Sequence, residues 1–66
     1  MKEIRFAENL KNLRLTAKLT QLEVAKYVGV DQRTISAWEK GVCEPSFQSL
    51  MLLCELFNET FDDILT

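Results

Sequence analysis

The side chains best suited to chemistry stand between residues 32 and 40, where an amide, a guanidinium, a hydroxyl, a methyl group and an ammonium lie close together. If Ile35 and Trp38 point into a core, a helix turning about 100° per residue presents the other groups outward or at its first turn. Glutamine bonds adenine bidentately, arginine bonds guanine O6 and N7, and a methyl group packs on thymine. We therefore expect this face to read the base edges of DNA, the alternative being an ordinary solvent-exposed face. The expected base-reading residues are Gln32, Arg33, Ser36 and Ala37.

A second set of polar residues stands where a phosphate can be held. Thr20 and Glu23 have the spacing of a capping box, which opens a helix at Gln21. Free backbone N–H groups and the positive end of the helix dipole attract an anion at that point. We expect Thr20, Gln21 and Lys40 to contact DNA phosphates, although a capping role explains Thr20 at least as well.

The elements that carry these residues are predicted to be helices throughout. The chain has two glycines and one proline, and no stretch alternates apolar with polar residues as a strand does. The pattern predicts an all-α fold with five short helices, over residues 5–17, 20–28, 32–40, from Pro45-Ser46, and from Thr60. The residues expected to face inward on the first helix and on the last two are Phe6, Leu10, Leu13, Ala17; Phe47, Leu50, Met51, Cys54, Phe57; Phe61 and Ile64.

The second and third helices have the spacing of a helix-turn-helix. Ala25 is small where the two helices must cross closely, and Gly29 tolerates the positive φ that a short reversal needs. Asp31 can cap the third helix, and Gly41 suits the left-handed position after it. The wedge between the helices is filled by apolar residues, which are Val24, Val28, Val30, Ile35 and Trp38.

Several short motifs are spread over residues 6–65. They are Leu13-Arg14, Leu19-Thr20-Gln21, Leu22-x-x-Ala25, Gly29-Val30, Ile35-Ser36-x-Trp38-Glu39-Lys40-Gly41, Pro45-Ser46 and Phe61-Asp62-Asp63-Ile64. With these motifs the chain resembles the Cro/repressor-type (Xre-like) helix-turn-helix domains of phage and bacterial regulators. The resemblance implies a compact five-helix, lambda-repressor-like DNA-binding domain whose third helix enters the major groove, often as a two-fold dimer.

The same resemblance implies roles for single residues. Gln21 would contact a phosphate and brace Gln32, and Arg14 would form a buried ion pair with Glu39, the alternative for Arg14 being a phosphate contact. Asp31 departs from the family pattern, because many relatives have Ser or Thr there near a phosphate that a carboxylate repels. The loop 42–44 also lacks the basic residues that several relatives place beside the DNA backbone. We therefore expect modest DNA affinity that depends on a second subunit.

Charge is unevenly distributed along the 66 residues. The formal net charge is −2, and all eight Lys and Arg lie in residues 1–40 beside five acids, while residues 41–66 hold five acids and no base. The first segment is therefore positive and the second negative. This asymmetry predicts one face for an anion and another that avoids it, the alternative being two ordinary solvated surfaces.

Composition excludes several other classes of protein. Zero histidines and two cysteines leave no ordinary zinc site, and no arrangement of residues suggests an acid–base pair or a nucleophile. No signal peptide or long apolar run is present in the sequence. We expect a cytoplasmic, non-enzymatic chain with one domain over residues 1–66, without metal, cofactor or small-molecule effector.

One apolar pair does not fit the expected core. Leu52 shares a face of the fourth helix with three polar residues, and Leu56 extends that face by one turn. We interpret the pair as a candidate homodimer patch, the alternative being that both leucines pack under the last helix.

The sequence therefore predicts a prokaryotic or phage transcriptional regulator, a repressor, that binds a short inverted repeat in double-stranded DNA as a homodimer. The alternative is a protein-interaction module, such as an antitoxin-like or anti-regulator subunit, with weak or no DNA binding. The acidic second half favours that alternative.

Overall fold

Five helices make up the computed structural model, which describes residues 4–66. They are α1 (Phe6–Thr16), α2 (Gln21–Val28), α3 (Gln32–Glu39), α4 (Phe47–Phe57) and α5 (Phe61–Leu65). No strand occurs within these residues, so the predicted all-α, five-helix fold is confirmed. The prediction of one domain over residues 1–66 stays a prediction, since it includes positions outside the described range.

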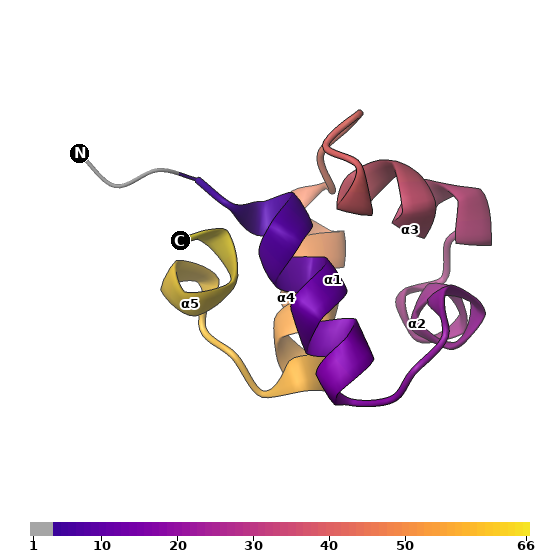
Figure 1. Ribbon diagram of the computed structural model, residues 1–66, viewed down its shortest axis with the longest axis horizontal. Coiled ribbons are helices and arrows are strands. Elements are labelled where there is room, and N and C mark those ends of the chain that lie inside the picture. The colour runs from indigo at the N-terminus through magenta and orange to yellow at the C-terminus, as the bar shows by residue number, and fades with distance from the viewer. Residues whose placement is uncertain (1–3) are drawn as a thin grey trace.

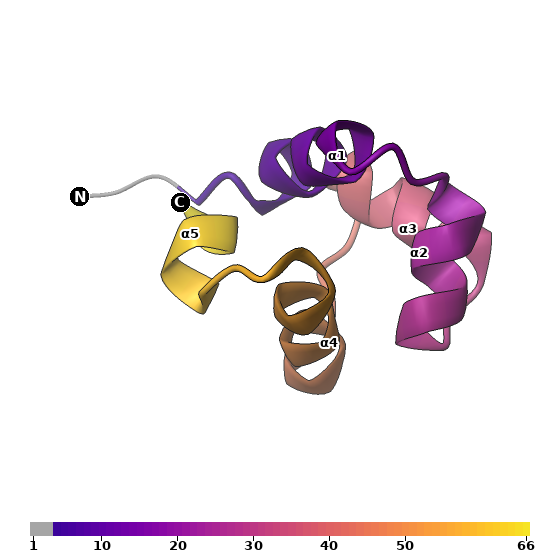
Figure 2. The same ribbon diagram turned by 90° about the horizontal axis from the view of Figure 1, so that it is seen from below.

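The helices are arranged around α1 and α4 (Figures 1 and 2). In both views α2 and α3 lie together at one end of the long axis, and α5 lies at the other. Helix α1 packs against α3 and α5, while α4 packs against α2 and α5. The pair α2–α3 is therefore supported from behind by two helices and leaves its other side open.

Side-chain caps determine where the helices begin. The hydroxyl of Thr20 accepts a bond from the Glu23 N–H at 3.1 Å, and the Glu23 carboxylate accepts from the Thr20 N–H at 2.9 Å, which completes the predicted capping box. The Asp31 carboxylate accepts from the Arg33 N–H and the Ser46 hydroxyl accepts from the Ser49 N–H, and these bonds cap α3 and α4. Thr60 caps α5 through the Asp63 N–H, without the return bond that a second capping box would have.

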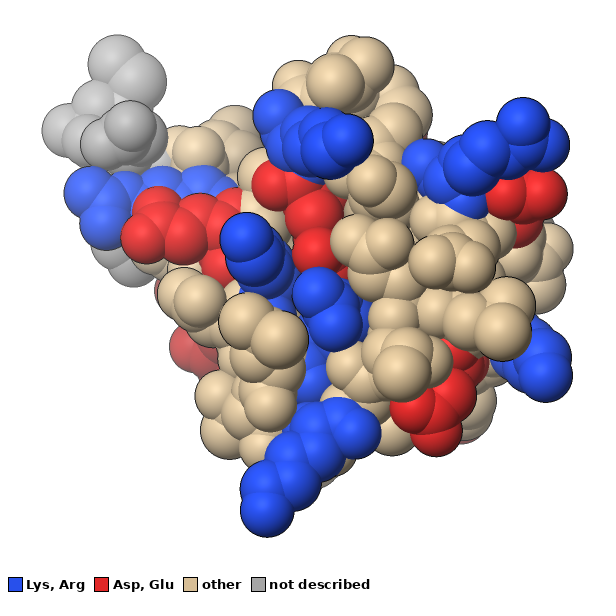
Figure 3. Space-filling view, turned by 45° about the vertical axis from the view of Figure 1, so that its right-hand side comes forward, with Lys and Arg blue, Asp and Glu red and all other residues tan. Residues whose placement is uncertain are grey.

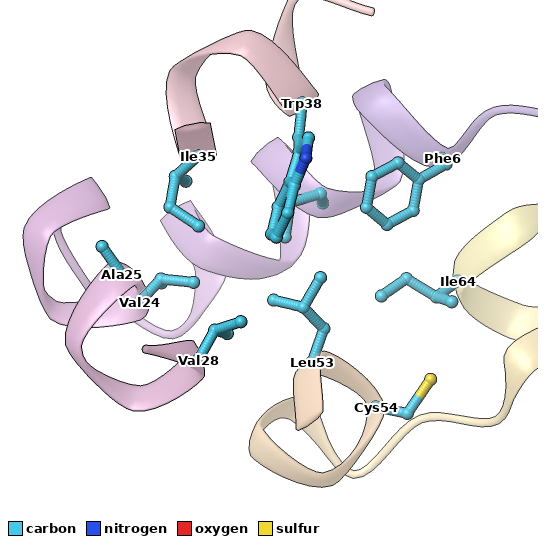
Figure 4. Packing of buried hydrophobic residues seen from close by; sticks show 10 residues of the cluster. Phe6, Val24, Ala25, Val28, Ile35, Trp38, Leu53, Cys54 and Ile64 are labelled. Atoms are coloured by element: carbon cyan, nitrogen blue, oxygen red, sulfur yellow. The ribbon is translucent and has the colours of Figure 1, made fainter. Parts of the chain in front are cut away.

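Every helix contributes a large, fully buried aliphatic side chain to a single core (Figure 4). In order along the chain these are Leu10, Val24, Ile35, Leu53 and Ile64. Figure 4 shows Leu53 of α4 between Val28 of α2, Trp38 of α3 and Ile64 of α5. All five helices therefore pack around one shared core.

Helix α4 turns a different side to the core from the one that its pattern indicated. Leu53, which we did not place in the core, is fully buried, whereas Phe47 is 67% and Met51 51% exposed. Eight of the eleven residues of α4 are apolar or cysteine, so few polar residues mark a solvent-facing side. Because apolar residues occur almost all round α4, the neighbouring α2 and α5 decide which side is buried.

Two further expectations about apolar residues are wrong. Phe61 is exposed and stands edge-on to Phe47, with ring centroids 5.2 Å apart, while Ile64 alone of the two α5 residues is buried. Leu52 and Leu56 are half-buried and pack against the core, which favours the alternative given for them, and their role as a homodimer patch stays a prediction. Ala17 lies exposed at the end of α1.

We predict that Leu53→Ala lowers the free energy of unfolding by about 2–5 kcal/mol, because it leaves a cavity where the helices meet. Met51→Ala on the same helix should change that free energy by only about 0.5 kcal/mol, since its side chain is half in solvent. Urea denaturation followed by circular dichroism measures both. Equal losses for the two variants would contradict this assignment of the buried side of α4.

Candidate nucleic-acid interface

The turn between α2 and α3 sets the angle at which α3 is presented. Gly29 ends α2 with φ at 85°, and a Cβ on it would meet no atom within 4 Å. The backbone conformation, and not lack of space, therefore requires glycine here. Ala25 is buried at the crossing, and its carbonyl accepts bonds from the N–H groups of Gly29 at 2.8 Å and Val30 at 3.0 Å.

Helix α3 separates its inner and outer faces as the sequence predicts. Ile35 and Trp38 are buried. Gln32 and Arg33 are exposed at the first turn, and Ser36 and Ala37 are half-buried further along. The face that α3 turns away from the core is formed by the polar groups of Gln32, Arg33 and Ser36 and the methyl group of Ala37.

The three residues expected to contact phosphate differ in exposure and in the hydrogen bonds that they already make. Lys40 is exposed just after α3, and Thr20 is exposed at the start of α2 with its hydroxyl occupied by the cap. Gln21 is half-buried, and its side-chain amide donates to Glu39 Oε1 at 3.2 Å. The expected brace from Gln21 to Gln32 is therefore wrong in this structure, because the amide faces the opposite end of α3.

Gln21 joins an ion pair that ties three segments together. The Nε of Arg14 lies 2.6 Å from Glu39 Oε2, and its Nη2 donates to Glu39 Oε1 at 3.1 Å. A further Arg14 nitrogen, Nη1, donates to the Leu19 carbonyl at 3.0 Å. Only 12% of the Arg14 side chain and 4% of the Glu39 side chain are exposed, and the bond to Glu39 raises the pKa of Arg14.

This network adds Gln21 and the Leu19 carbonyl to the expected pair of Arg14 and Glu39. It links the last turn of α1, the chain before α2, the first residue of α2 and the last residue of α3. The pairing of Arg14 with Glu39 matches what the resemblance implied. The third member, Gln21, carried no separate signal, since residues 18 positions apart meet only through the crossing of the helices.

Basic side chains are spread over the end of the molecule formed by α2 and α3 (Figure 3). Acidic groups lie between them. Two acidic residues, Glu23 and Asp31, take part in the caps at the starts of α2 and α3. The bond from the Thr20 backbone lowers the pKa of Glu23, and the bond from the Arg33 backbone lowers the pKa of Asp31. Both carboxylates are therefore ionised at neutral pH, and Asp31 adds a negative charge at the start of α3.

Other kinds of site find little support in the part of the chain that the structure describes. No cluster of three or more metal-ligating side chains occurs among residues 4–66. Over the same range no helix is long and apolar enough to cross a membrane. Cys43 and Cys54 are free cysteines. Cys43 is exposed, whereas Cys54 is buried and desolvation raises the pKa of its thiol.

Two helices crossing at a small residue, with a left-handed glycine between them and a polar outer face on the second, define a helix-turn-helix domain. The sequence model of the helix-turn-helix family matches residues 10–64. The chain therefore belongs to the helix-turn-helix family, and its resemblance to the Cro/repressor-type branch is confirmed.

Known relatives of this chain include two longer bacterial proteins. The antitoxin PezA of Streptococcus pneumoniae is 39% identical over 57 residues, which cover 86% of this chain and 36% of that protein. The HTH-type transcriptional activator BcrR of Enterococcus faecalis is 36% identical over 61 residues, which cover 92% of this chain and 30% of that protein. The chain thus spans about a third of the length of these relatives.

A solved structure with the same fold is that of the P22 c2 repressor protein in complex with a synthetic operator. It superimposes with a TM-score of 0.88 at 27% sequence identity, over 100% of this chain and 97% of that one. The expected lambda-repressor-like architecture is therefore confirmed.

We predict that Arg14→Met lowers the free energy of unfolding by about 3–5 kcal/mol, because it leaves the desolvated Glu39 carboxylate without its partner. The double variant Arg14→Met/Glu39→Leu should recover much of this loss, since an apolar pair of similar volume removes the buried charge. Urea denaturation of the two single variants and the double variant measures the coupling.

Arg33→Met is the matched control for this cycle. Arg33 also faces a carboxylate, that of Asp31, but its side chain is 93% exposed. Its replacement should leave the urea midpoint nearly unchanged. Losses that simply add in the Arg14/Glu39 double variant would contradict the coupling.

Proposed function

We propose that this chain is the sequence-specific DNA-binding domain of a transcriptional regulator, which acts as a repressor with α3 in the major groove. The observation that carries the proposal is the outer face of α3, where Gln32 and Arg33 stand free of the core while Ile35 and Trp38 anchor the helix. The superposition on a repressor solved with its operator supports the same placement.

In this proposal the roles of the polar residues divide into two groups. Gln32, Arg33, Ser36 and Ala37 read base edges, with each bidentate pair supplying roughly 1–3 kcal/mol of discrimination. Thr20, Gln21 and Lys40 contact phosphates, which set the position of the domain without reading sequence. The hydrogen bond to Glu39 holds the Gln21 amide still, which supports a fixed register.

A binding role without catalysis, cofactor or metal stays our prediction for the chain, as does a cytoplasmic location in a prokaryote or phage. The family is one of DNA-binding regulators, which supports the non-enzymatic interpretation.

The second candidate is a protein-interaction module with weak or no DNA binding. Its support is the similarity to an antitoxin and the surplus of acids in residues 41–66. In this candidate the helix-turn-helix would remain as a scaffold, and the acidic half would meet a partner.

We expect the protein to bind labelled random duplex at about 50 mM salt and to bind it more weakly as salt rises. Gln21→Ala should weaken binding to all sequences alike, whereas Gln32→Ala and Arg33→Ala should relax preference for a site selected from a random library. Fluorescence anisotropy with selected and random duplexes separates these effects. No binding at about 50 mM salt would favour the second candidate.

We also propose that two copies act together on an inverted repeat, with half-sites roughly 34 Å apart. Three exposed apolar side chains, Phe47, Met51 and Phe61, offer a larger surface for self-association than the half-buried Leu52 and Leu56 do. Phe47 contacts Phe61 of α5, the helix that lies farthest from α2 and α3 along the molecule.

We predict that Phe47→Ser weakens this self-association, while Leu15→Ser, at a similarly exposed leucine of α1, leaves it unchanged. Residues 41–66, which carry this surface, hold five acids and no basic residue, so the two copies repel each other. Added salt should strengthen the dimer, because it screens this repulsion. Sedimentation equilibrium at several salt concentrations tests both points. A monomer at all concentrations, or equal effects of the two variants, would overturn the proposed surface.

A further inference from the structure

Two charged side chains at the first turn of α3 are bonded to each other. Asp31 Oδ1 accepts a hydrogen bond from the Arg33 backbone N–H at 2.8 Å and another from the Arg33 Nε at 3.3 Å. Both side chains reach into solvent, Arg33 at 93% and Asp31 at 59% exposure. One carboxylate oxygen therefore caps the helix and orients a guanidinium at the same time.

This contact limits how Arg33 can bind a base. A guanidinium has five N–H donors, and here the Nε–H is directed to Asp31. The four Nη donors remain, and the edge formed by Nη1 and Nη2 presents two parallel donors. Guanine O6 and N7 are the pair of acceptors in the major groove that such an edge matches. The structure therefore favours an end-on contact between Arg33 and guanine.

The charge of Asp31 also affects what else can approach this corner. The N-terminus of a helix attracts anions through its free N–H groups and its dipole. Asp31 already occupies the Arg33 N–H, and the same hydrogen bonds lower the pKa of its carboxyl group, so it stays ionised and repels phosphate. Arg33 is thus kept for bases, at the expense of attraction to the DNA backbone.

We infer that Asp31 is a specificity-determining residue, which orients Arg33 end-on for one guanine and lowers binding to DNA of any other sequence. The inference rests on the proposed function, since it names the base that the outer face of α3 selects. It also gives Asp31 a function beyond capping, because the repulsion of phosphate, which lowers general DNA affinity, here increases selectivity for the base.

Asp31→Asn tests this inference, because asparagine caps a helix as well as aspartate does and removes the charge. Selection from a random library with the wild-type protein first defines the site. Anisotropy then measures binding to that site, to versions with each G·C pair replaced by A·T, and to random duplex. Thermal denaturation of Asp31→Asn checks that the variant is folded.

We expect the two affinities to move in opposite directions. Discrimination in favour of one guanine should fall by about two- to fivefold in Asp31→Asn, and binding to random duplex should become tighter by about two- to fivefold. In an Arg33→Lys background, Asp31→Asn should not change the base preference, because lysine lacks the planar fork. Glu23→Gln is the matched control, since it removes another capping carboxylate near the interface and should leave guanine discrimination unchanged.

The failures of the two proposals can be told apart. Absence of duplex binding by the wild-type protein overturns the proposed function and this inference with it. Sequence-selective binding in which Asp31→Asn keeps full guanine discrimination overturns the inference alone. A selected site with no guanine preference that depends on Arg33 does the same. An effect of Asp31→Asn that persists with Lys at position 33 also overturns it, and indicates that Asp31 contacts a base directly.

Discussion

The buried ion pair between Arg14 and Glu39 is the interaction on which the placement of α3 depends. Two hydrogen bonds join the guanidinium to the two carboxylate oxygens, and the Gln21 amide and the Leu19 carbonyl bond to further groups of the same network. Charges removed from water are tolerated only when their hydrogen bonds are satisfied. No buried side-chain nitrogen or oxygen within residues 4–66 lacks a partner. This requirement holds α1, the start of α2 and the end of α3 in one relative arrangement.

A short reading helix needs this external support. α3 has eight residues, and its inner face gives Ile35 and Trp38 to the core. A helix of that length is not stable alone in water, so packing must hold it. The shared core supplies that packing from behind, and the ion pair fixes the far end. The first turn, with Gln32 and Arg33, is consequently free to be polar, and the same turn contains the Asp31 carboxylate.

The charge distribution then balances attraction to DNA against selectivity. The basic residues all lie in the first 40 positions, yet Glu23 and Asp31 stand as ionised caps at the starts of α2 and α3. Each such carboxylate weakens the general attraction to phosphate, which supplies most non-specific binding. A domain of this kind would depend more on base contacts and on a second copy than on its net charge of −2.

Local signals in the sequence determined where the helices begin and end and which residues form the helix-turn-helix. Thr20, Asp31 and Gly29 act through bonds and φ angles within their own few residues, so reading them requires no knowledge of distant contacts. Only the tertiary structure decided which side of α4 is buried. The apolar residues of α4 occur almost all round the helix, so its packing against neighbouring helices determines the buried side. The tertiary structure also decided that Gln21 turns to Glu39 and not to Gln32. Both outcomes depend on how separate helices cross, which a one-dimensional pattern does not encode.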